Sequence, residues 1–248
     1  MNLQVQMLGT GTVFTKKYYN NNALVYVNGY KLMIDCGVTA PRSLSELQIP
    51  LHAIDGILIS HIHSDHVGGL EEVAFHLMYS ARTKIKLFVP SSIADPLWER
   101  SLRGGLENPA DGINRLEDYF DVVTIEDNTK TDLFEGLSIE AIRTKHIPQK
   151  PSYSFVLNDY VFYSADTVFD FSLLKEMHEN RKCKYILHEC QFNSPGLVHA
   201  TLDELLTLPD EIQEKVFLMH YNDNKDQYVG KTGRMRFLEQ HQLYEFPL

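Results

Sequence analysis

The sequence predicts one α/β domain in which helices cover two β-sheets. Three observations lead to this prediction. Short segments rich in Val, Ile, Tyr and Phe recur along the chain. The early half has hairpin-like strands, whereas strands and helices alternate in the later half. No linker, repeat or low-complexity stretch divides the 248 residues, which are enough to bury a sizeable core. We therefore expect a single domain over residues 1–248.

The expected strands are short apolar runs bounded by turn residues. They span residues 4–8, 23–27, 31–34, 56–60, 85–89, 122–125, 137–143, 153–157, 161–163, 185–187 and 216–219. The expected helices span residues 41–47, 69–79, 96–103, 171–179, 202–207 and 235–241. Asp95 before Pro96 is typical of an N-cap followed by proline at the first helical position, with Gly104 and Gly105 closing that helix. Thr201 and Glu204 have the spacing of a capping box.

Charge and composition limit the possible partners. Lys and Arg number 23 against 33 Asp and Glu, a formal net charge of −10. On average such a protein repels polyanions, so a small anion is a better expected partner than a long nucleic acid. The scattered Cys36, Cys183 and Cys190 form no disulfide framework, which suits a reducing cytosol. We expect no membrane association and a cytoplasmic location, because the start lacks a signal-like pattern and no apolar run could span a bilayer.

A dense cluster of metal-binding residue types follows the apolar residues 57–59. It reads His61-Ile62-His63-Ser64-Asp65-His66. Imidazole nitrogens and carboxylate oxygens suit zinc and similar divalent ions, and alternate residues such as His61 and His63 point to one side of an extended chain. Histidines also occur in runs on surfaces, but the position at a strand end favours a metal site.

Three further polar residues stand where expected strands end, namely His146, Asp166 and His220. Each alone is more often a capping or solvated residue, but together they repeat one pattern, an apolar strand followed by His or Asp. We expect them to complete two sites on one rim of the sheets. The first holds His61, His63 and His146, the second holds Asp65, His66 and His220, and Asp166 bridges both.

Two divalent ions are therefore the expected cofactors. Zinc is the default, although His and carboxylate ligands also accept manganese or iron. Two such ions about 3.5–4 Å apart activate a water nucleophile at neutral pH and neutralise a phosphoryl oxygen, as in-line displacement at phosphorus requires.

The signature at residues 61–66 resembles that of the metallo-β-lactamase fold hydrolases, and this resemblance implies an αββα four-layer sandwich. True β-lactamases commonly have Cys where Asp166 stands here, so the chain is more similar to a phosphodiesterase or glyoxalase branch. Asp35 matches the acidic strand-end residue with which the family supports its metal site, although alone it could equally be a turn residue.

Further motifs are similar to those of ribonuclease Z, the tRNA 3′-processing endonuclease. They are the segment from His188 to Cys190, the segment from His199 to Thr201, and an amino-terminal loop that includes residues 8–11 and 20–22. By this likeness His199 donates a proton to the departing sugar oxygen, and Glu189 orients and polarises its ring. In the alternative interpretation, Glu189 caps a strand and His199 only precedes a helix.

The chain departs from ribonuclease Z in ways that favour a smaller substrate. The long glycine-rich arm that grips tRNA has no counterpart, and the net charge is −10. The sequence is closer to the compact cyclic-nucleotide phosphodiesterases of this branch, notably the phage anti-Pycsar proteins. Their likeness implies a homodimer, with residues 98–118 as the candidate contact made in trans, and action in the host cytosol if the protein is phage-encoded.

We thus expect a dinuclear metal-dependent phosphodiesterase that opens 3′,5′-cyclic nucleotides to nucleoside monophosphates. Asp65 orients the nucleophile and accepts its proton, while His199 protonates the leaving 3′ oxygen. A ribonuclease Z-like tRNA endonuclease, a glyoxalase-type thioester hydrolase and a non-catalytic cyclic-nucleotide sponge remain alternatives.

Other suggestive residues receive no catalytic role. Gly9 and Gly11 lack the third glycine of a dinucleotide-binding loop. The segment 16–19 mixes Lys and Tyr as base-binding surfaces do, but surface exposure is the commoner explanation. The remaining histidines considered lie outside the converging set: His52, His76, His178 and His241.

Overall fold

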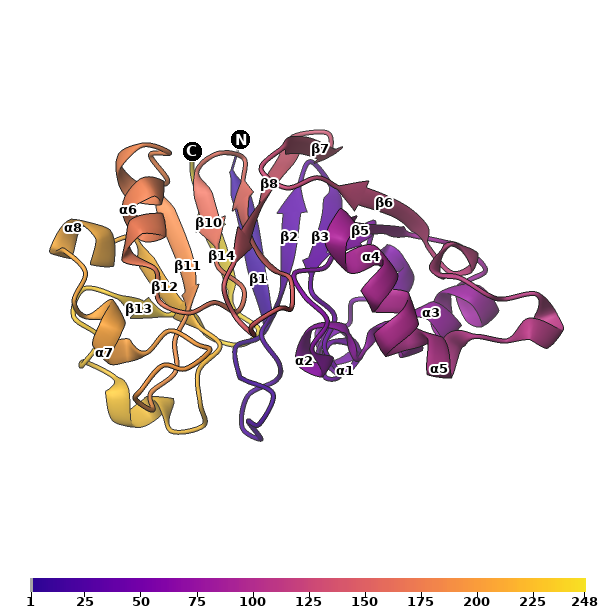
Figure 1. Cartoon of the computed structure of the whole chain (residues 1–248), viewed down its shortest axis with the longest axis horizontal. Helices are drawn as coiled ribbons and strands as arrows, with labels where there is room; N and C mark the ends of the chain where they lie inside the picture. Colours follow the sequence, from indigo (N-terminus) through magenta and orange to yellow (C-terminus); the bar gives the residue numbers. More distant parts are fainter. Residues whose placement is uncertain (1) are drawn as a thin grey trace.

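The computed structural model describes residues 2–248 and contains two mixed sheets of seven strands each (Figure 1). The strands of the first sheet, in spatial order, are β14 (Leu243–Phe246), β1 (Leu3–Gly9), β2 (Asn22–Val27), β3 (Tyr30–Ile34), β4 (Gly56–Leu58), β5 (Lys86–Pro90) and β6 (Asp121–Ile125). Those of the second sheet are β13 (Arg236–Phe237), β12 (Val216–Met219), β11 (Tyr185–Glu189), β10 (Val161–Tyr163), β9 (Ser152–Leu157), β8 (Leu137–Thr144) and β7 (Lys130–Phe134).

Each sheet joins an antiparallel half to a parallel half. In the first sheet β3, β4, β5 and β6 run parallel, and in the second sheet β10, β11, β12 and β13 do. The carboxyl ends of neighbouring parallel strands lie at the same sheet edge, where open α/β sheets bind their ligands. The loops that follow β3, β4, β10, β11 and β12 are therefore gathered on one rim.

Helices cover the outer faces of both sheets. The first sheet carries α1 (Ala40–Glu46), α2 (Ser64–Val67), α3 (Leu70–Phe75), α4 (Ser91–Leu97) and α5 (Arg103–Leu106), and the second carries α6 (Phe171–Glu179), α7 (Leu202–Leu205) and α8 (Asp210–Gln213) (Figure 1). One apolar cluster joins residues of both sheets, such as Ile57 and Phe155. A second cluster joins Ile186 of β11 to Leu174 of α6. The four αββα layers predicted from the sequence are confirmed.

Local signals predicted some elements well and others badly. The helix over residues 171–179 and the capping box of Thr201 with Glu204 are confirmed. The helix start at Asp95 is wrong, because α4 begins at Ser91 and contains Pro96 in its interior. The stop at Gly104 and Gly105 is also wrong, since both lie within α5. A Cβ at Gly105 would lie 2.0 Å from Glu71 Oε2, the end of a flexible side chain on α3.

The helix expected over residues 235–241 is wrong. Arg236 and Phe237 instead form β13, paired in parallel with Phe217 and Leu218 of β12, and the Leu238 N–H donates to the Leu218 carbonyl over 2.9 Å. Pairing with a strand edge satisfies the backbone groups that a short helix would have satisfied internally. The edge strands β7 and β14 were also not predicted, since both mix charged and apolar residues.

Two further observations concern the helices and the segment at the edge of the first sheet. None of the helices in the described chain combines the length and apolar character needed to cross a bilayer. The segment 98–118 extends beyond the edge of the first sheet, at the right of Figure 1.

Candidate metal centre

The cluster at residues 61–66 forms the loop after β4 and the short helix α2. The hydrogen bond from Cys36 N–H to the His66 carbonyl, 2.7 Å, holds α2 against the loop that follows β3. Gly37 makes this close approach possible, because a Cβ there would lie 1.9 Å from the Asp65 carbonyl oxygen. His61, Asp65 and His66 are consequently buried at the rim.

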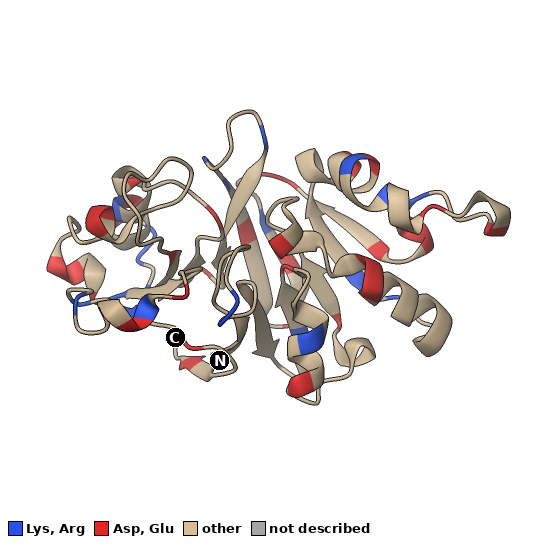
Figure 2. Ribbon diagram, turned by 90° about the horizontal axis from the view of Figure 1, so that it is seen from below, with Lys and Arg blue, Asp and Glu red and all other residues tan. Residues whose placement is uncertain are grey.

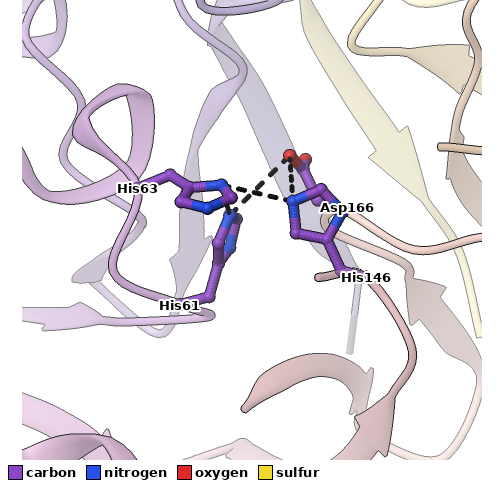
Figure 3. Close-up of side chains that lie close together, drawn as sticks. All are labelled: His61, His63, His146 and Asp166. Carbon is purple, nitrogen blue, oxygen red and sulfur yellow. Dashed lines mark hydrogen bonds and ion pairs between the residues drawn. The ribbon is translucent and has the colours of Figure 1, made fainter. Parts of the chain in front are cut away.

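The first group of converging side chains contains His61, His63, His146 and Asp166 (Figure 3). His63 Nδ1 lies 3.0 Å from His61 Nε2 and 3.2 Å from His146 Nε2. Asp166 Oδ2 lies 3.7 Å from His61 Nε2 and 3.8 Å from His146 Nε2. The Nδ1–H of His146 donates to the Val198 carbonyl over 2.7 Å, which leaves its Nε2 as the unprotonated nitrogen facing the group.

The second group contains Asp65, His66, Asp166 and His220. Asp166 Oδ1 lies 3.3 Å from His66 Nε2 and 3.5 Å from His220 Nε2. Asp65 Oδ2 lies 3.5 Å from each of the same two nitrogens. Asp166 thus belongs to both groups, presenting Oδ2 to one and Oδ1 to the other. The structure brings all seven side chains that were expected as ligands together at this rim, while their role as ligands stays a prediction.

The spacing of the second group fits a divalent cation. Zinc bonds of about 2.0–2.1 Å in tetrahedral geometry place neighbouring ligand atoms about 3.3 Å apart, close to the 3.3–3.5 Å separations here. Among the described residues, His66 Nε2, His220 Nε2 and Asp166 Oδ1 are buried without a hydrogen-bond partner. Such groups are costly to bury unless something compensates them, and a cation bound between them does so.

Hydrogen bonds behind the ligands fix their orientation. Asp35 Oδ2 lies 2.7 Å from His66 Nδ1, so the ring donates to the carboxylate and keeps Nε2 free of a proton. Ser60 donates its N–H and its hydroxyl to the same carboxylate, over 2.8 and 2.7 Å. The Ser60 hydroxyl also lies 3.0 Å from His61 Nδ1. Asp35 therefore supports one residue of each group, the role that its resemblance implied.

Electrostatics differ between the two groups. Burial lowers the pKa of His61 well below its ordinary value and that of His63 to about 4, so both rings are neutral, as metal ligands must be. Burial acts in the same direction on His66 and His220, but the surrounding carboxylates outweigh it and raise the pKa of His220 to about 10. The second group therefore has excess negative charge, which protons or a cation must balance.

Glu189 and His199 stand beside the second group. Glu189 Oε2 accepts from His199 Nδ1 over 2.8 Å and lies 3.4 Å from His220 Nδ1, while its Oε1 accepts the N–H of Thr167. Burial opposes protonation of His199, yet the Glu189 carboxylate raises the pKa of the ring above its ordinary value. With Nδ1 bonded to Glu189, the nitrogen of His199 that can exchange a proton with a ligand is Nε2.

Three residues at the same rim adopt a strained backbone conformation. Asp35, Ala165 and His220 have φ of 61°, 47° and 54°, in the left-handed region that non-glycine residues rarely adopt. Each such residue costs of order 1–3 kcal/mol and persists where the surrounding structure holds it in place.

A cavity of about 340 Å³ opens over the two groups. Among residues 2–248, no Lys or Arg lines this cavity. The lining consists of Thr12, Val13, Phe14, His63, Asp65, His146, Ile147, Asp166, Gln191, Asn193, Val198, His199, His220 and Asn222. A ligand here meets two acidic side chains and several imidazoles, so its negative charge must be balanced by bound cations.

Sequence reasoning missed several contributors to this rim. Ser60 and the Val198 carbonyl had no signal of their own, because they act on Asp35 and His146, which are distant in sequence. Phe14 had none because its place in the cavity wall depends on the fold. Of the histidines given no role, His52 and His76 stack on each other with ring centroids 6.3 Å apart, and His241 Nε2 lies 3.0 Å from the Ser43 hydroxyl.

Comparison with known proteins identifies the family and the fold. The family model described as Anti-Pycsar protein Apyc1 matches residues 3–244. A protein of that name from Paenibacillus xerothermodurans is 56% identical over 99% of this chain and 98% of its own length. Another from Bacillus phage BSP38 is 46% identical over 97% of each. The crystal structure of the metallo-β-lactamase fold protein YhfI from Bacillus subtilis superposes with a TM-score of 0.76 at 15% identity, covering 99% of this chain and 100% of YhfI.

Proposed function

Because the chain belongs to the anti-Pycsar protein Apyc1 family, we propose that it hydrolyses 3′,5′-cyclic nucleotides to nucleoside monophosphates. The observation that carries the proposal is the sharing of Asp166 between two ligand groups that face one cavity with His199. One bound water is added across the bond between phosphorus and the 3′ oxygen, which leaves a 5′-monophosphate and a free 3′ hydroxyl.

The ligand groups would hold two divalent ions, with His61, His63 and His146 at one, Asp65, His66 and His220 at the other, and Asp166 at both. When bound, two such ions neutralise phosphoryl oxygens and lower the pKa of a water molecule. Zinc suits these donors, and manganese or iron would also be accepted.

The chain's own residues supply the proton transfers. Asp65 lines the cavity with a carboxylate oriented by its contacts to His66 and His220, so it can orient the attacking water and take up its proton. His199 Nε2 delivers a proton to the departing 3′ oxygen, since Nδ1 is held by Glu189. Glu189 orients His199 and supports its protonated form.

Cavity size and charge favour a small monoanion over RNA. A volume of about 340 Å³ lies within the range for small-molecule sites. A cyclic phosphodiester carries one negative charge, which the two ions can neutralise without help from Lys or Arg. Figure 2 shows acidic and basic residues intermingled over the helices of both flanks, and the net charge is −10. Binding of an RNA backbone would need Lys and Arg side chains placed along its path to neutralise the phosphates.

We further propose that the protein acts as a homodimer in the cytosol and removes a cyclic-nucleotide signal that restricts phage growth. The phage-encoded relative supports this role.

The test is incubation with a panel of 3′,5′-cyclic mononucleotides, with and without a chelator, followed by chromatography. We expect metal-dependent formation of 5′-monophosphates by the wild type and none by Asp166→Ala. Precursor tRNA serves as the rival substrate in a parallel gel assay. Cleavage of tRNA without hydrolysis of any cyclic nucleotide would replace this proposal with a tRNA endonuclease, and binding without product would indicate a sponge.

A further inference from the structure

Phe14 is an aromatic side chain held in solvent beside the metal centre. It lines the same cavity as His63, Asp166 and His199, yet 82% of its surface is exposed. Burying a Phe side chain contributes about 1.5–3 kcal/mol, so leaving one in water at the wall of a cavity calls for an explanation. A ligand that covers the ring while it occupies the cavity provides one.

The loop that carries Phe14 is anchored. The backbone N–H groups of Lys16 and Lys17 donate to the carboxylate of Asp223, each over 2.9 Å. The Thr15 hydroxyl lies 2.7 Å from the Thr12 carbonyl and 2.9 Å from the Tyr18 carbonyl, and its single proton is shared between them. These hydrogen bonds hold the backbone on the carboxyl-terminal side of Phe14, so the loop presents the residue at the cavity wall.

Two tyrosines and one lysine of this loop already have partners. Tyr18 packs edge-on against Tyr221 with ring centroids 5.1 Å apart, and the Tyr19 hydroxyl donates to Glu46 over 2.6 Å. Lys17 forms an ion pair with Asp226. The side chains of Lys17, Tyr18 and Tyr19 therefore make contacts within the protein, and Phe14 is the aromatic residue of this loop that lines the cavity.

Phe14 also stands between two adjoining hollows. The first is the cavity over the metal centre, and the second, of about 330 Å³, is lined by Thr15, Asp223 and Asn224. Four residues line both: Thr12, Phe14, Asn193 and Asn222. A substrate whose phosphate lies at the ligand groups can therefore extend past the ring into a polar hollow.

The amide groups at this boundary suit the edge of a nucleobase. Asn222 Oδ1 accepts the N–H of Phe192 over 3.3 Å, which leaves the amide nitrogen of Asn222 as a donor for a ligand. Every nucleobase has acceptor atoms on its edges, so such a donor does not select one base strongly. An aromatic face is equally tolerant, because every base has a π-face.

We propose that Phe14 is the residue on which the nucleobase of the substrate stacks, with Asn193 and Asn222 at the base edge. The inference rests on the proposed function and adds to it a base subsite that tolerates purines and pyrimidines alike. The metal centre binds the phosphate, the sugar lies between, and Phe14 covers the base.

The test compares kcat and KM of the wild type with those of Phe14→Ala and Phe14→Trp. The substrates are the four common 3′,5′-cyclic mononucleotides and 1-deoxyribose 3′,5′-cyclic phosphate, which lacks a base. Loss of base stacking predicts a 5- to 150-fold rise in KM, about the range of measured stacking contributions, for all four nucleotides in Phe14→Ala. Phe14→Trp should retain wild-type KM values, and the baseless substrate should be hydrolysed equally by all three proteins.

Leu197→Ala is the matched control, because Leu197 is 79% exposed but lines neither hollow. It should leave every kinetic constant unchanged. Equal KM values in wild type and Phe14→Ala for all four nucleotides would overturn the inference and leave the proposed function standing. A dimer that dissociates in Phe14→Ala, with equal losses on the baseless substrate, would instead assign Phe14 to a contact between copies. A wild type inactive on every cyclic nucleotide would overturn the proposed function and the base subsite with it.

Discussion

Asp35 Oδ2 lies 2.7 Å from His66 Nδ1 at the rim of the first sheet. Both residues are fully buried, so their contact is not an incidental surface ion pair. The carboxylate accepts the ring proton and thereby decides which nitrogen of His66 faces the second ligand group. A residue outside both ligand groups would thus control whether an ion binds to the second group.

Replacing Asp35 with Asn should weaken metal binding while leaving the protein folded. The Asn side chain can donate its NH2 group to His66 Nδ1, which favours the tautomer with the proton on Nε2, where the ion must bind. Loss of such an orienting partner typically costs about 10- to 100-fold in metal affinity. Metal content after dialysis against buffered zinc gives the readout. Asp55→Asn is the control, because the Asp55 carboxylate accepts the Lys31 N–H over 2.8 Å and belongs to neither ligand group.

Replacing Asp166 with Ala should abolish metal loading and activity together, because this one carboxylate serves both ligand groups. His63→Ala, which removes a residue of the first group, is expected to behave in the same way. Elemental analysis and product chromatography on the same preparation check both properties. An Asp166→Ala protein with two bound ions would contradict the bridging role.

His199→Ala should separate metal binding from turnover. His199 belongs to neither of the groups that contain Asp166, and its ring is bonded to Glu189. The variant should retain its ions and lose about 10²-fold or more in kcat, the range for removal of a general acid. Full turnover by the metal-loaded variant would remove His199 from the mechanism.

The ligand residues could be recognised from the sequence because of how parallel strands are arranged. His61, Asp166 and His220 each follow an apolar strand, and the carboxyl ends of parallel strands meet at one edge. The pattern of apolar strand followed by His or Asp therefore predicts proximity without any knowledge of strand order. The same reasoning could not find Phe14, whose significance depends on exposure, or Ser60, whose role depends on Asp35 across a strand pair.

The errors in the fold have a related cause. Residues 235–241 carry a helical pattern, but Arg236 and Phe237 find an open strand edge at β12. The start of α4 was misplaced because Asp95 and Pro96 have the local signature of a helix start, although the helix begins at Ser91. Tertiary pairing and packing overrode local preference in both places.

Removing the ions should destabilise the protein. In the second group Asp65 and Asp166 are buried close together, and an ion bound between them would bind the folded state only. At a free ion concentration of about 100 Kd, binding adds about 2.7 kcal/mol, which for a chain of this size corresponds to a melting temperature about 5–10 °C higher. Differential scanning calorimetry with chelator and with added zinc measures the shift. His199→Ala should show the same shift as the wild type, and Asp166→Ala should show none.

Gly37→Ala should damage the metal centre through the backbone. An added Cβ would lie 1.9 Å from the carbonyl oxygen of Asp65, and a backbone atom cannot move aside without displacing α2 and its ligands. Overpacking of this kind costs about 1–3 kcal/mol of stability, and metal affinity should fall with it. Gly104→Ala is the matched control, since a Cβ there meets nothing within 4 Å and alanine favours the helical conformation of α5. Denaturant unfolding and zinc titration of the two variants test this, and a Gly37→Ala protein as stable and as zinc-loaded as Gly104→Ala would show that α2 can shift without cost.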